Sequence, residues 1–162
     1  MVKIAQIGVG YWGPNLLRNL TTNYNCTVKI VVDLSPERQD FVKKLYPSIH
    51  VTDNMDAIFN DPDINAVVIA TPVASQYDLA IKTLSAGKHV LVEKPMATNS
   101  SQVRKIGQLA AKKRLVAMVG HTFLYNSAVR YIKNIVQSGE LGKVRYIYSQ
   151  RVNLGRIRND VD

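Results

Sequence analysis

The feature that most constrains this chain is a glycine-rich turn close to its beginning. Residues 2–7 are mostly apolar, and Gly8, Gly10 and Gly13 follow them with the spacing Gly-x-Gly-x-x-Gly. A helical pattern comes next, and a second apolar stretch ends at Asp33, which lies 20 residues after Gly13. A strand, a glycine turn, a helix and a second strand ending in an acid are the parts of a dinucleotide-binding βαβ unit. The chain is therefore predicted to begin with such a unit.

Each glycine of this turn has a separate expected task. Gly8 permits the tight turn, Gly10 lets the backbone approach a pyrophosphate, and Gly13 lets the helix pack close to the strand. Tyr11 and Trp12 lie within the same motif and belong to the same candidate cofactor site. The N-terminus of the following helix would present free N–H groups to the phosphates. The alternative is that the glycines only make a tight turn between a strand and a helix.

Asp33 is the residue expected to choose the cofactor. Its carboxylate would accept the two hydroxyls of the adenosine ribose, and its negative charge would repel a 2′-phosphate. Leu34 follows it, not an arginine that could hold such a phosphate, so NAD is favoured over NADP. The alternative is an acid that merely precedes the helix start at Ser35-Pro36, where serine suits the N-cap and proline the first helical position.

Composition excludes several classes of protein. The 162 residues suit one domain, or one domain and part of another. The net charge is +9, but the basic residues are scattered and show no nucleic-acid-binding motif, so no nucleic-acid partner is expected. No apolar run approaches the ~20 residues of a membrane span, and no signal peptide is visible. Cys26 is the one cysteine, which leaves no internal disulfide and no metal site and favours a reduced cytoplasm.

Strand-like and helix-like stretches alternate through the first 120 residues. The candidate strands are short and rich in Val and Ile, as buried parallel strands are: 3–7, 28–32, 49–51, 66–70, 89–92 and 116–119. The helical patterns between them lie at 16–20, from Ser35 onward, at 76–86 and at 100–113. This alternation predicts an α/β fold with a doubly wound parallel sheet.

After Gly120 the pattern changes. Residues 127–138 have helical periodicity, and residues 143–152 alternate polar with apolar or aromatic side chains, which is typical of a half-exposed strand. We expect a Rossmann domain over 1–121, and over 122–162 the first helix and strand of an incomplete α+β domain. Because that strand would present an unpaired apolar edge, the chain is expected to form a homo-oligomer through residues 126–152.

Three further motifs connect the chain to a known family. They are Val-Val-Ile-Ala-Thr-Pro at 67–72, Ala-Gly-Lys-His-Val-Leu-Val-Glu-Lys-Pro at 86–95, and Ser-Gly-Glu-Leu-Gly-Lys-Val at 138–144. With the glycine turn, they closely resemble the glucose–fructose oxidoreductase, inositol dehydrogenase and rhizopine-catabolism (Gfo/Idh/MocA) family. Residues 120–126 and 151–162 also resemble the subgroup that oxidises the 3-hydroxyl of UDP-N-acetylglucosaminuronate.

The resemblance implies further site residues. It adds six residues to the candidate cofactor site: Thr71, Pro72, Gln76, Glu93, Lys94 and Pro95. Lys94 would be catalytic, since a partly buried lysine beside the positive nicotinamide ring suits proton relay; the alternative is a surface lysine after a strand. A cis peptide before Pro95 would position it. Glu93 would orient Lys94, face the ribose or only end the strand. Gln76 replaces a histidine that the family often carries, and it cannot carry a proton.

The resemblance also limits what the chain can do. The family's second domain supplies an Asp and a His beyond residue 162, and Asp160 and Asp162 are not that acid. The implied function is NAD-dependent hydride transfer from a sugar or nucleotide-sugar alcohol, with the chain forming mainly the cofactor-binding part. The alternative is an NAD-binding module without catalytic activity. A methyltransferase that uses S-adenosylmethionine is a weaker alternative, because Glu-Lys-Pro and the six-strand spacing argue against it.

Overall fold

The computed structural model describes residues 1–150 and 152 and divides into two units. The first unit is Met1–Gly120, and the second begins at His121. Residues 151 and 153–162, which carry part of the subgroup resemblance together with Asp160 and Asp162, lie outside the described residues. None of the helices within the described residues is long and apolar enough to cross a membrane.

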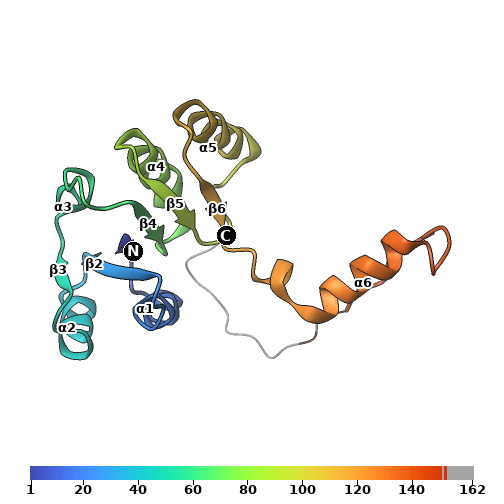
Figure 1. Cartoon of the computed structure of the whole chain (residues 1–162), viewed down its shortest axis with the longest axis horizontal. Coiled ribbons are helices and arrows are strands. Elements are labelled where there is room, and N and C mark those ends of the chain that lie inside the picture. The colour runs from blue at the N-terminus through green and yellow to red at the C-terminus, as the bar shows by residue number, and fades with distance from the viewer. Residues whose placement is uncertain (151, 153–162) are drawn as a thin grey trace. The chain divides into compact units, whose positions relative to one another are not determined.

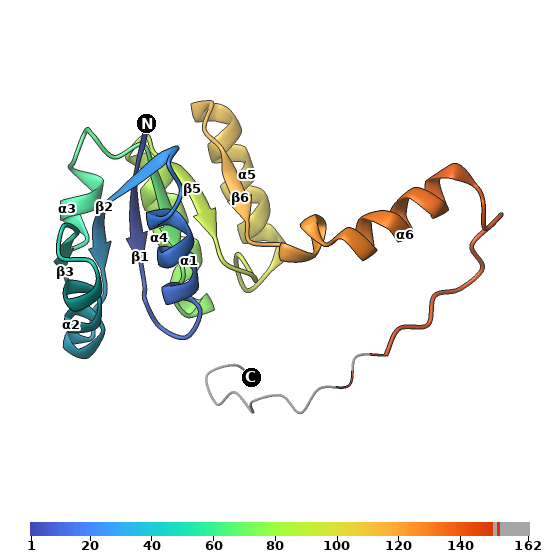
Figure 2. The same ribbon diagram turned by 60° about the horizontal axis from the view of Figure 1, so that its bottom comes forward.

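The first unit is built on a parallel sheet of six strands. The strands are β1 (Val2–Ile7), β2 (Cys26–Val32), β3 (His50–Thr52), β4 (Ala66–Ile69), β5 (His89–Val92) and β6 (Ala117–Val119). Their order is β3-β2-β1-β4-β5-β6, and Figure 2 shows them side by side in this order. Every neighbouring pair is parallel. The first three strands are added toward one edge of the sheet and the last three toward the other, so the strand order reverses between β1 and β4.

Helices cover both faces of this sheet. They are α1 (Gly13–Thr21), α2 (Pro36–Leu45), α3 (Asp56–Phe59), α4 (Val73–Ser85) and α5 (Ser100–Lys113). Figure 1 shows α1 and α2 on one face and α4 and α5 on the other. The core is divided in the same way, since Leu17 and Val42 pack with Val31, while Leu84 and Ile106 pack with the opposite side of the sheet. The predicted doubly wound α/β fold is confirmed.

The local signals in the sequence place most helix ends correctly. Ser35 caps α2, and its side chain accepts a hydrogen bond from the backbone N–H of Arg38. Gly87 follows α4 with φ of 77°, a left-handed conformation that glycine adopts at little cost. Helix α4 begins at Val73, three residues earlier than predicted, because Pro72 ends the loop after β4 and serves as its N-cap. Helix α3 was not predicted, since one turn is too short to show a helical period.

The second unit differs from the sequence prediction in two elements. A 3₁₀ helix, η1 (Thr122–Tyr125), precedes α6 (Ser127–Ser138), which has the predicted bounds. The predicted strand over 143–152 is wrong for the described residues, because 143–150 and 152 lie in no strand. A strand is stable only when its backbone groups pair with a neighbour, and none of the described segments pairs with this one. The alternation of polar and apolar side chains is typical of a strand with one buried face, but it does not provide the neighbouring strand that such a segment needs.

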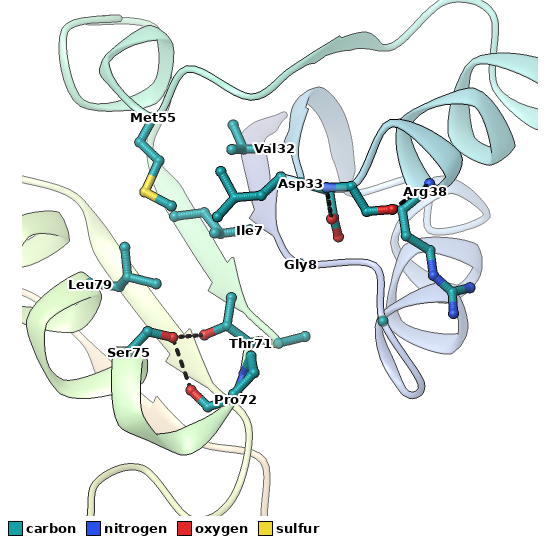
Figure 3. A pocket seen from close by; sticks show the side chains of 14 residues that line it. Ile7, Gly8, Val32, Asp33, Arg38, Met55, Thr71, Pro72, Ser75 and Leu79 are labelled. Carbon is teal, nitrogen blue, oxygen red and sulfur yellow. Dashed lines mark hydrogen bonds between the residues drawn. The ribbon is translucent and has the colours of Figure 1, made fainter. Parts of the chain in front are cut away.

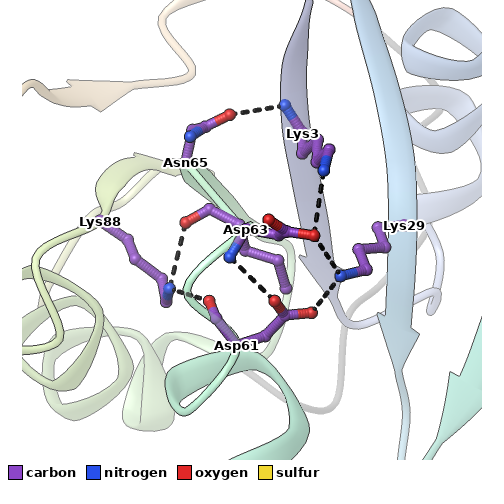
Figure 4. Close-up of polar contacts among 7 residues, drawn as sticks. Lys3, Lys29, Asp61, Asp63, Asn65 and Lys88 are labelled. Carbon is purple, nitrogen blue, oxygen red and sulfur yellow. Dashed lines mark hydrogen bonds and ion pairs between the residues drawn. The ribbon is translucent and has the colours of Figure 1, made fainter.

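A cluster of charges links β1 and β2 with the segments that precede β4 and β5 (Figure 4). Lys29 Nζ lies 2.7 Å from Asp61 Oδ2, and its hydrogen bond is the main reason that the pKa of Asp61 is lowered. Lys3 Nζ lies 3.0 Å from Asp63 Oδ2 and lowers the pKa of Asp63. Lys88 is buried, and its Nζ donates to Asp61 O at 2.6 Å and to Ile64 O at 3.1 Å. Burial removes the Lys88 ammonium from water and lowers its pKa. The two carbonyl groups that accept its hydrogen bonds replace part of the lost hydration.

Replacing Lys88 with methionine is expected to destabilise the first unit by about 1–3 kcal/mol. Methionine keeps an apolar stem but leaves the two carbonyls of the 61–64 loop without their donor. Urea unfolding measures the loss, with Lys29→Met as the control, since Lys29 is half-exposed and loses only surface ion pairs. Equal losses in the two variants would show that Lys88 is not the residue that anchors this loop.

Candidate functional site

The main pocket lies at the carboxyl ends of β1, β2 and β4 (Figure 3). Its volume is about 460 Å³, and the residues that line it are Ile7, Gly8, Gly10, Val32, Asp33, Leu34, Ser35, Arg38, Met55, Ala70, Thr71, Pro72, Ser75 and Leu79. In an open parallel sheet, ligands bind at this edge where the strand order reverses, which here is between β1 and β4. The pocket therefore brings together Gly8, Gly10, Asp33, Thr71 and Pro72 from the predicted site.

The three glycines of the turn have different surroundings. Gly8 has φ of 91°, and a Cβ built on it would lie 2.6 Å from Ala70 O, so the turn packs directly on the end of β4. A Cβ on Gly13 would lie 2.5 Å from Gly8 O, which confirms that this glycine allows close packing of helix and strand. A Cβ on Gly10 would meet no atom within 4 Å. Gly8 and Gly13 are thus required by the fold, whereas Gly10 leaves space open for a ligand.

A buried glutamine holds the glycine turn and was not predicted from the sequence. The side chain of Gln6 is fully buried, and its Nε2 donates to Gly8 O and Gly13 O, both at 2.9 Å. Two carbonyl acceptors require the NH₂ end of the amide, so the orientation of Gln6 is fixed by chemistry. Its Oε1 is buried and has no partner among the described residues. A polar residue two positions before the first glycine, within an otherwise apolar strand, is the signal that could have identified it.

Asp33 connects the loops that follow β1 and β2. Its Oδ2 accepts a hydrogen bond from Val9 N at 2.7 Å, and its Oδ1 accepts one from Ser35 N at 2.9 Å. The second bond is the cap-like contact that was the structural alternative, and the first ties Asp33 to the glycine turn. Each carboxylate oxygen has more than one lone pair, so both can still accept a ligand hydroxyl. The Asp33 side chain can therefore hold the start of α2 and still accept the hydroxyls of a ribose.

The loop after β4 forms the opposite wall of the pocket. Ser75 Oγ lies 2.9 Å from both Thr71 Oγ1 and Pro72 O. Gln76, predicted at the cofactor, is buried and does not line the pocket. Its Nε2 donates to Thr71 O at 2.9 Å, so it acts on the site by holding this loop.

The remaining predicted residues lie outside the pocket lining. Tyr11 and Trp12 are at the tip of the glycine turn, where Tyr11 is exposed and Trp12 is about half-exposed. Lys94 is exposed, not partly buried as expected. The peptide bond between Lys94 and Pro95 is cis, as predicted.

The carboxylate of Glu93 reaches the end of β6. Its Oε2 accepts a hydrogen bond from Lys94 N at 3.2 Å. A Cβ on Gly120 would lie 3.0 Å from Glu93 Oε1, so this glycine gives the carboxylate its space. Among the described residues, no three His, Cys, Asp or Glu side chains gather in a way that could hold a metal ion.

Arg38, Ser35, Met55 and Leu79 line the pocket but were not predicted there. Arg38 is five residues past Asp33, yet the first turn of α2 brings it back to the same end of the pocket (Figure 3). Helical periodicity after the acid is the signal that could have identified it.

Comparisons with known proteins agree with this geometry. Residues 2–121 match the profile of an oxidoreductase family with an NAD-binding Rossmann fold, Gfo/Idh/MocA. An uncharacterized oxidoreductase of Escherichia coli is 32% identical over 148 residues, which are 91% of this chain and 42% of that protein. An NADP⁺-dependent scyllo-inositol 2-dehydrogenase of Bacillus subtilis is 28% identical, over 99% of this chain and 43% of its own.

Solved structures give the same result. The scyllo-inositol dehydrogenase of Lactobacillus casei with bound NAD(H) and scyllo-inositol is 26% identical and superposes with a TM-score of 0.80. The match covers 88% of this chain and 42% of that one. The chain thus spans less than half the length of the relatives that it matches.

Proposed function

The chain belongs to the Gfo/Idh/MocA oxidoreductase family, and from this premise we propose that its main pocket binds the adenosine half of NAD. The observation that carries the proposal is that Gly10 and Asp33 line one pocket at the point where the strand order reverses. Asp33 would accept the ribose hydroxyls, and the open space at Gly10 would admit the pyrophosphate. The apolar side chains of Ile7, Met55 and Leu79 suit an adenine ring.

The nicotinamide half would extend from the glycine turn toward the ends of β5 and β6. When bound, the nicotinamide would supply the acceptor for a hydride, and the protein's own residues would supply position and charge. We propose that Lys94 accepts the proton of the substrate hydroxyl, because Lys94 follows β5 at the same edge of the sheet as the pocket. Glu93, which contacts the backbone N–H of Lys94, would orient that loop.

The substrate class follows from the relatives and the sequence motifs. Relatives are named as dehydrogenases of scyllo-inositol, so a secondary alcohol on a sugar or cyclitol ring is the proposed substrate of the whole protein. The motif at 120–126 supports a UDP-sugar, as in the UDP-N-acetylglucosaminuronate subgroup. A reducing cytoplasm suits the single free thiol of Cys26.

Calorimetric titration of the chain with NAD and with NADP tests the cofactor assignment. NAD is expected to bind more tightly, because the Asp33 carboxylate accepts ribose hydroxyls and repels a 2′-phosphate. Equal or tighter binding of NADP would overturn the role given to Asp33. A chain that binds neither cofactor would overturn the proposed function.

The alternative function, an NAD-binding module without catalysis, is favoured by the exposure of Lys94. Lys94 is not among the residues that line the main pocket, so this pocket does not orient a substrate beside it. Orientation of the reactants can lower a barrier by ~7–11 kcal/mol, so its loss outweighs the presence of one lysine. We therefore expect the 162-residue chain to show negligible NADH production with any sugar or UDP-sugar. Steady turnover that is lost in Lys94→Ala would instead make this chain a complete enzyme.

We also propose that the chain self-associates through residues 126–152. Val129, Ile132 and Val136 recur at helical spacing on α6, and all three are at least 39% exposed. Since a partner helix would bury this apolar stripe, light scattering is expected to report a dimer. A chain ending at Gly120 is the control and should be monomeric. Two monomeric chains would refute this assembly.

A further inference from the structure

We propose that the neutral imidazole of His89 holds the start of strand β6, and that protonation of His89 at mildly acidic pH releases it. The inference does not depend on the proposed cofactor function. Strand β6 lies at one edge of the sheet, where it pairs with β5 (Figure 2). The boundary between the two units follows directly after it, at Gly120. A bond at the start of β6 therefore helps to hold the strand that leads from the first unit to the second.

One hydrogen bond fixes the protonation state that His89 must have. The backbone nitrogen of Val116, the residue before β6, lies 2.9 Å from His89 Nδ1. A backbone N–H can only donate, so Nδ1 must offer its lone pair and the neutral ring must carry its proton on Nε2. An imidazolium has hydrogens on both ring nitrogens and accepts no hydrogen bond. Protonation of His89 therefore replaces this bond with two opposed N–H groups.

Val116 depends on the imidazole because it lies between two elements. Helix α5 ends just before it, and the N–H groups of Arg114 and Leu115 are bonded to carbonyls of that helix. The carbonyl of Val116 accepts a hydrogen bond from Val90 N at 2.9 Å, which begins the pairing with β5. Among the described residues, the partner of the Val116 N–H is a side chain, His89, and not a backbone carbonyl. Loss of this bond removes one of the few that hold a strand of three residues.

The imidazole of His89 is accessible to solvent. His89 is half-buried, and Val116 beside it is 60% exposed. None of the described carboxylates forms an ion pair with His89. Protons from water can therefore reach the ring, and no bound carboxylate compensates the positive charge that results.

The other charged groups around β5 do not replace His89 as the titrating group. The elements that pack against β5 are β4, β6, α4 and α5, and the two strands carry no charged residue. The charged residues of the two helices are Asp78, Lys82, Arg104, Lys105, Lys112 and Lys113, and Lys88 and Arg114 flank the hydrogen bond. Hydrogen bonds from lysines lower the pKa of Asp61 and of Asp63, which precede β4, so both stay ionised at mildly acidic pH.

The test is NMR of the ¹⁵N-labelled full chain at about pH 8 and about pH 5.5, on either side of the usual titration range of imidazole. At the higher pH, the ring of His89 should carry a proton on Nε2 and none on Nδ1. At the lower pH, the protection of the Val116 amide against hydrogen exchange, corrected for the intrinsic rate, should fall about fivefold or more. The amide of Gly120, which donates to Val92 O at 2.9 Å beyond the other end of β6, is the internal reference and should change less.

Two variants isolate the imidazole. His89→Asn carries an acceptor, Oδ1, at the same number of bonds from the backbone as Nδ1, and this acceptor does not titrate. Its Val116 amide should be equally protected at both pH values. His50→Asn is the matched control, because His50 is exposed on the opposite edge strand, β3, and its side chain makes no hydrogen bond within the described residues. This control should keep the pH response of the unaltered chain.

Four results would overturn the proposal. A proton on Nδ1 at the higher pH would contradict the assigned hydrogen bond, and unchanged protection of Val116 at the lower pH would show that β6 does not depend on it. An equal fall in His89→Asn, or a lost response in His50→Asn, would assign the pH effect to other groups. If His89→Asn does not fold, the two measurements on the unaltered chain decide. NAD binding is measured separately and is not affected by any of these outcomes.

Discussion

Replacing Gly10 with valine is expected to weaken NAD binding by at least about a hundredfold while leaving the chain folded. A Cβ at Gly10 meets no protein atom within 4 Å, so the larger side chain has room in the free protein. That same room is where the pyrophosphate must approach the backbone, and the added methyl groups would exclude it. Circular dichroism and urea unfolding would report the fold, and calorimetry the affinity.

Gly8→Val provides the contrast for this prediction. Gly8 has φ of 91°, and its added Cβ would collide with Ala70 O, so this variant should lose stability as well as binding. If Gly10→Val binds NAD normally in a folded chain, the glycine turn is not the phosphate site. If both variants unfold alike, the open space at Gly10 has no functional meaning.

Replacing Gln6 with glutamate is expected to destabilise the first unit by about 3 kcal/mol or more at neutral pH. The substitution keeps the shape but replaces an NH₂ donor with an oxygen that faces Gly8 O and Gly13 O in a fully buried position. An ionised carboxylate there has neither water nor a donor. NAD affinity should fall with stability, because the same two carbonyls set the glycine turn.

The loss of stability in Gln6→Glu is expected to depend on pH in a definite direction. Burial raises the pKa of a carboxyl group, so the folded variant binds a proton more readily than the unfolded chain does. Its deficit should therefore be smaller near pH 5, where a neutral carboxyl can donate one hydrogen bond, and larger at pH 8. Gln6→Leu is the control, since it removes the donors without adding a charge and should show no such dependence. Identical pH profiles for the two variants would contradict the assigned hydrogen bonds.

The parts of the site that sequence predicts best are those that depend on backbone geometry. Gly8, Gly10 and Gly13 have a spacing dictated by one turn, and the structure gives each the surroundings that the spacing implies. Asp33 is similarly fixed, because it ends β2 beside the end of β1. The short Val- and Ile-rich stretches gave all six strands because buried parallel strands are apolar on both faces.

The parts that sequence missed depend on contacts between distant groups. Gln6 reads as an irregularity in a strand until two carbonyls are seen to converge on its amide. Arg38 reads as a surface residue of α2 until the helix start folds it beside Asp33. The strand expected over 143–152 failed for the opposite reason, because its pattern was present but no described segment pairs with it. Lys94 is exposed although partial burial was expected, because a position after a strand does not by itself fix how far a side chain is covered.

The most direct test of the central claim is an amide NMR titration of the ¹⁵N-labelled chain with NAD. The resonances of Gly8, Gly10 and Ser35 are expected to shift with a common saturation curve. The resonances of Ile64 and Lys88, at the opposite end of the strands, are expected to stay unchanged. Absence of shifts at the glycine turn under saturating NAD, or shifts confined to α6, would contradict the claim that this pocket is a cofactor site.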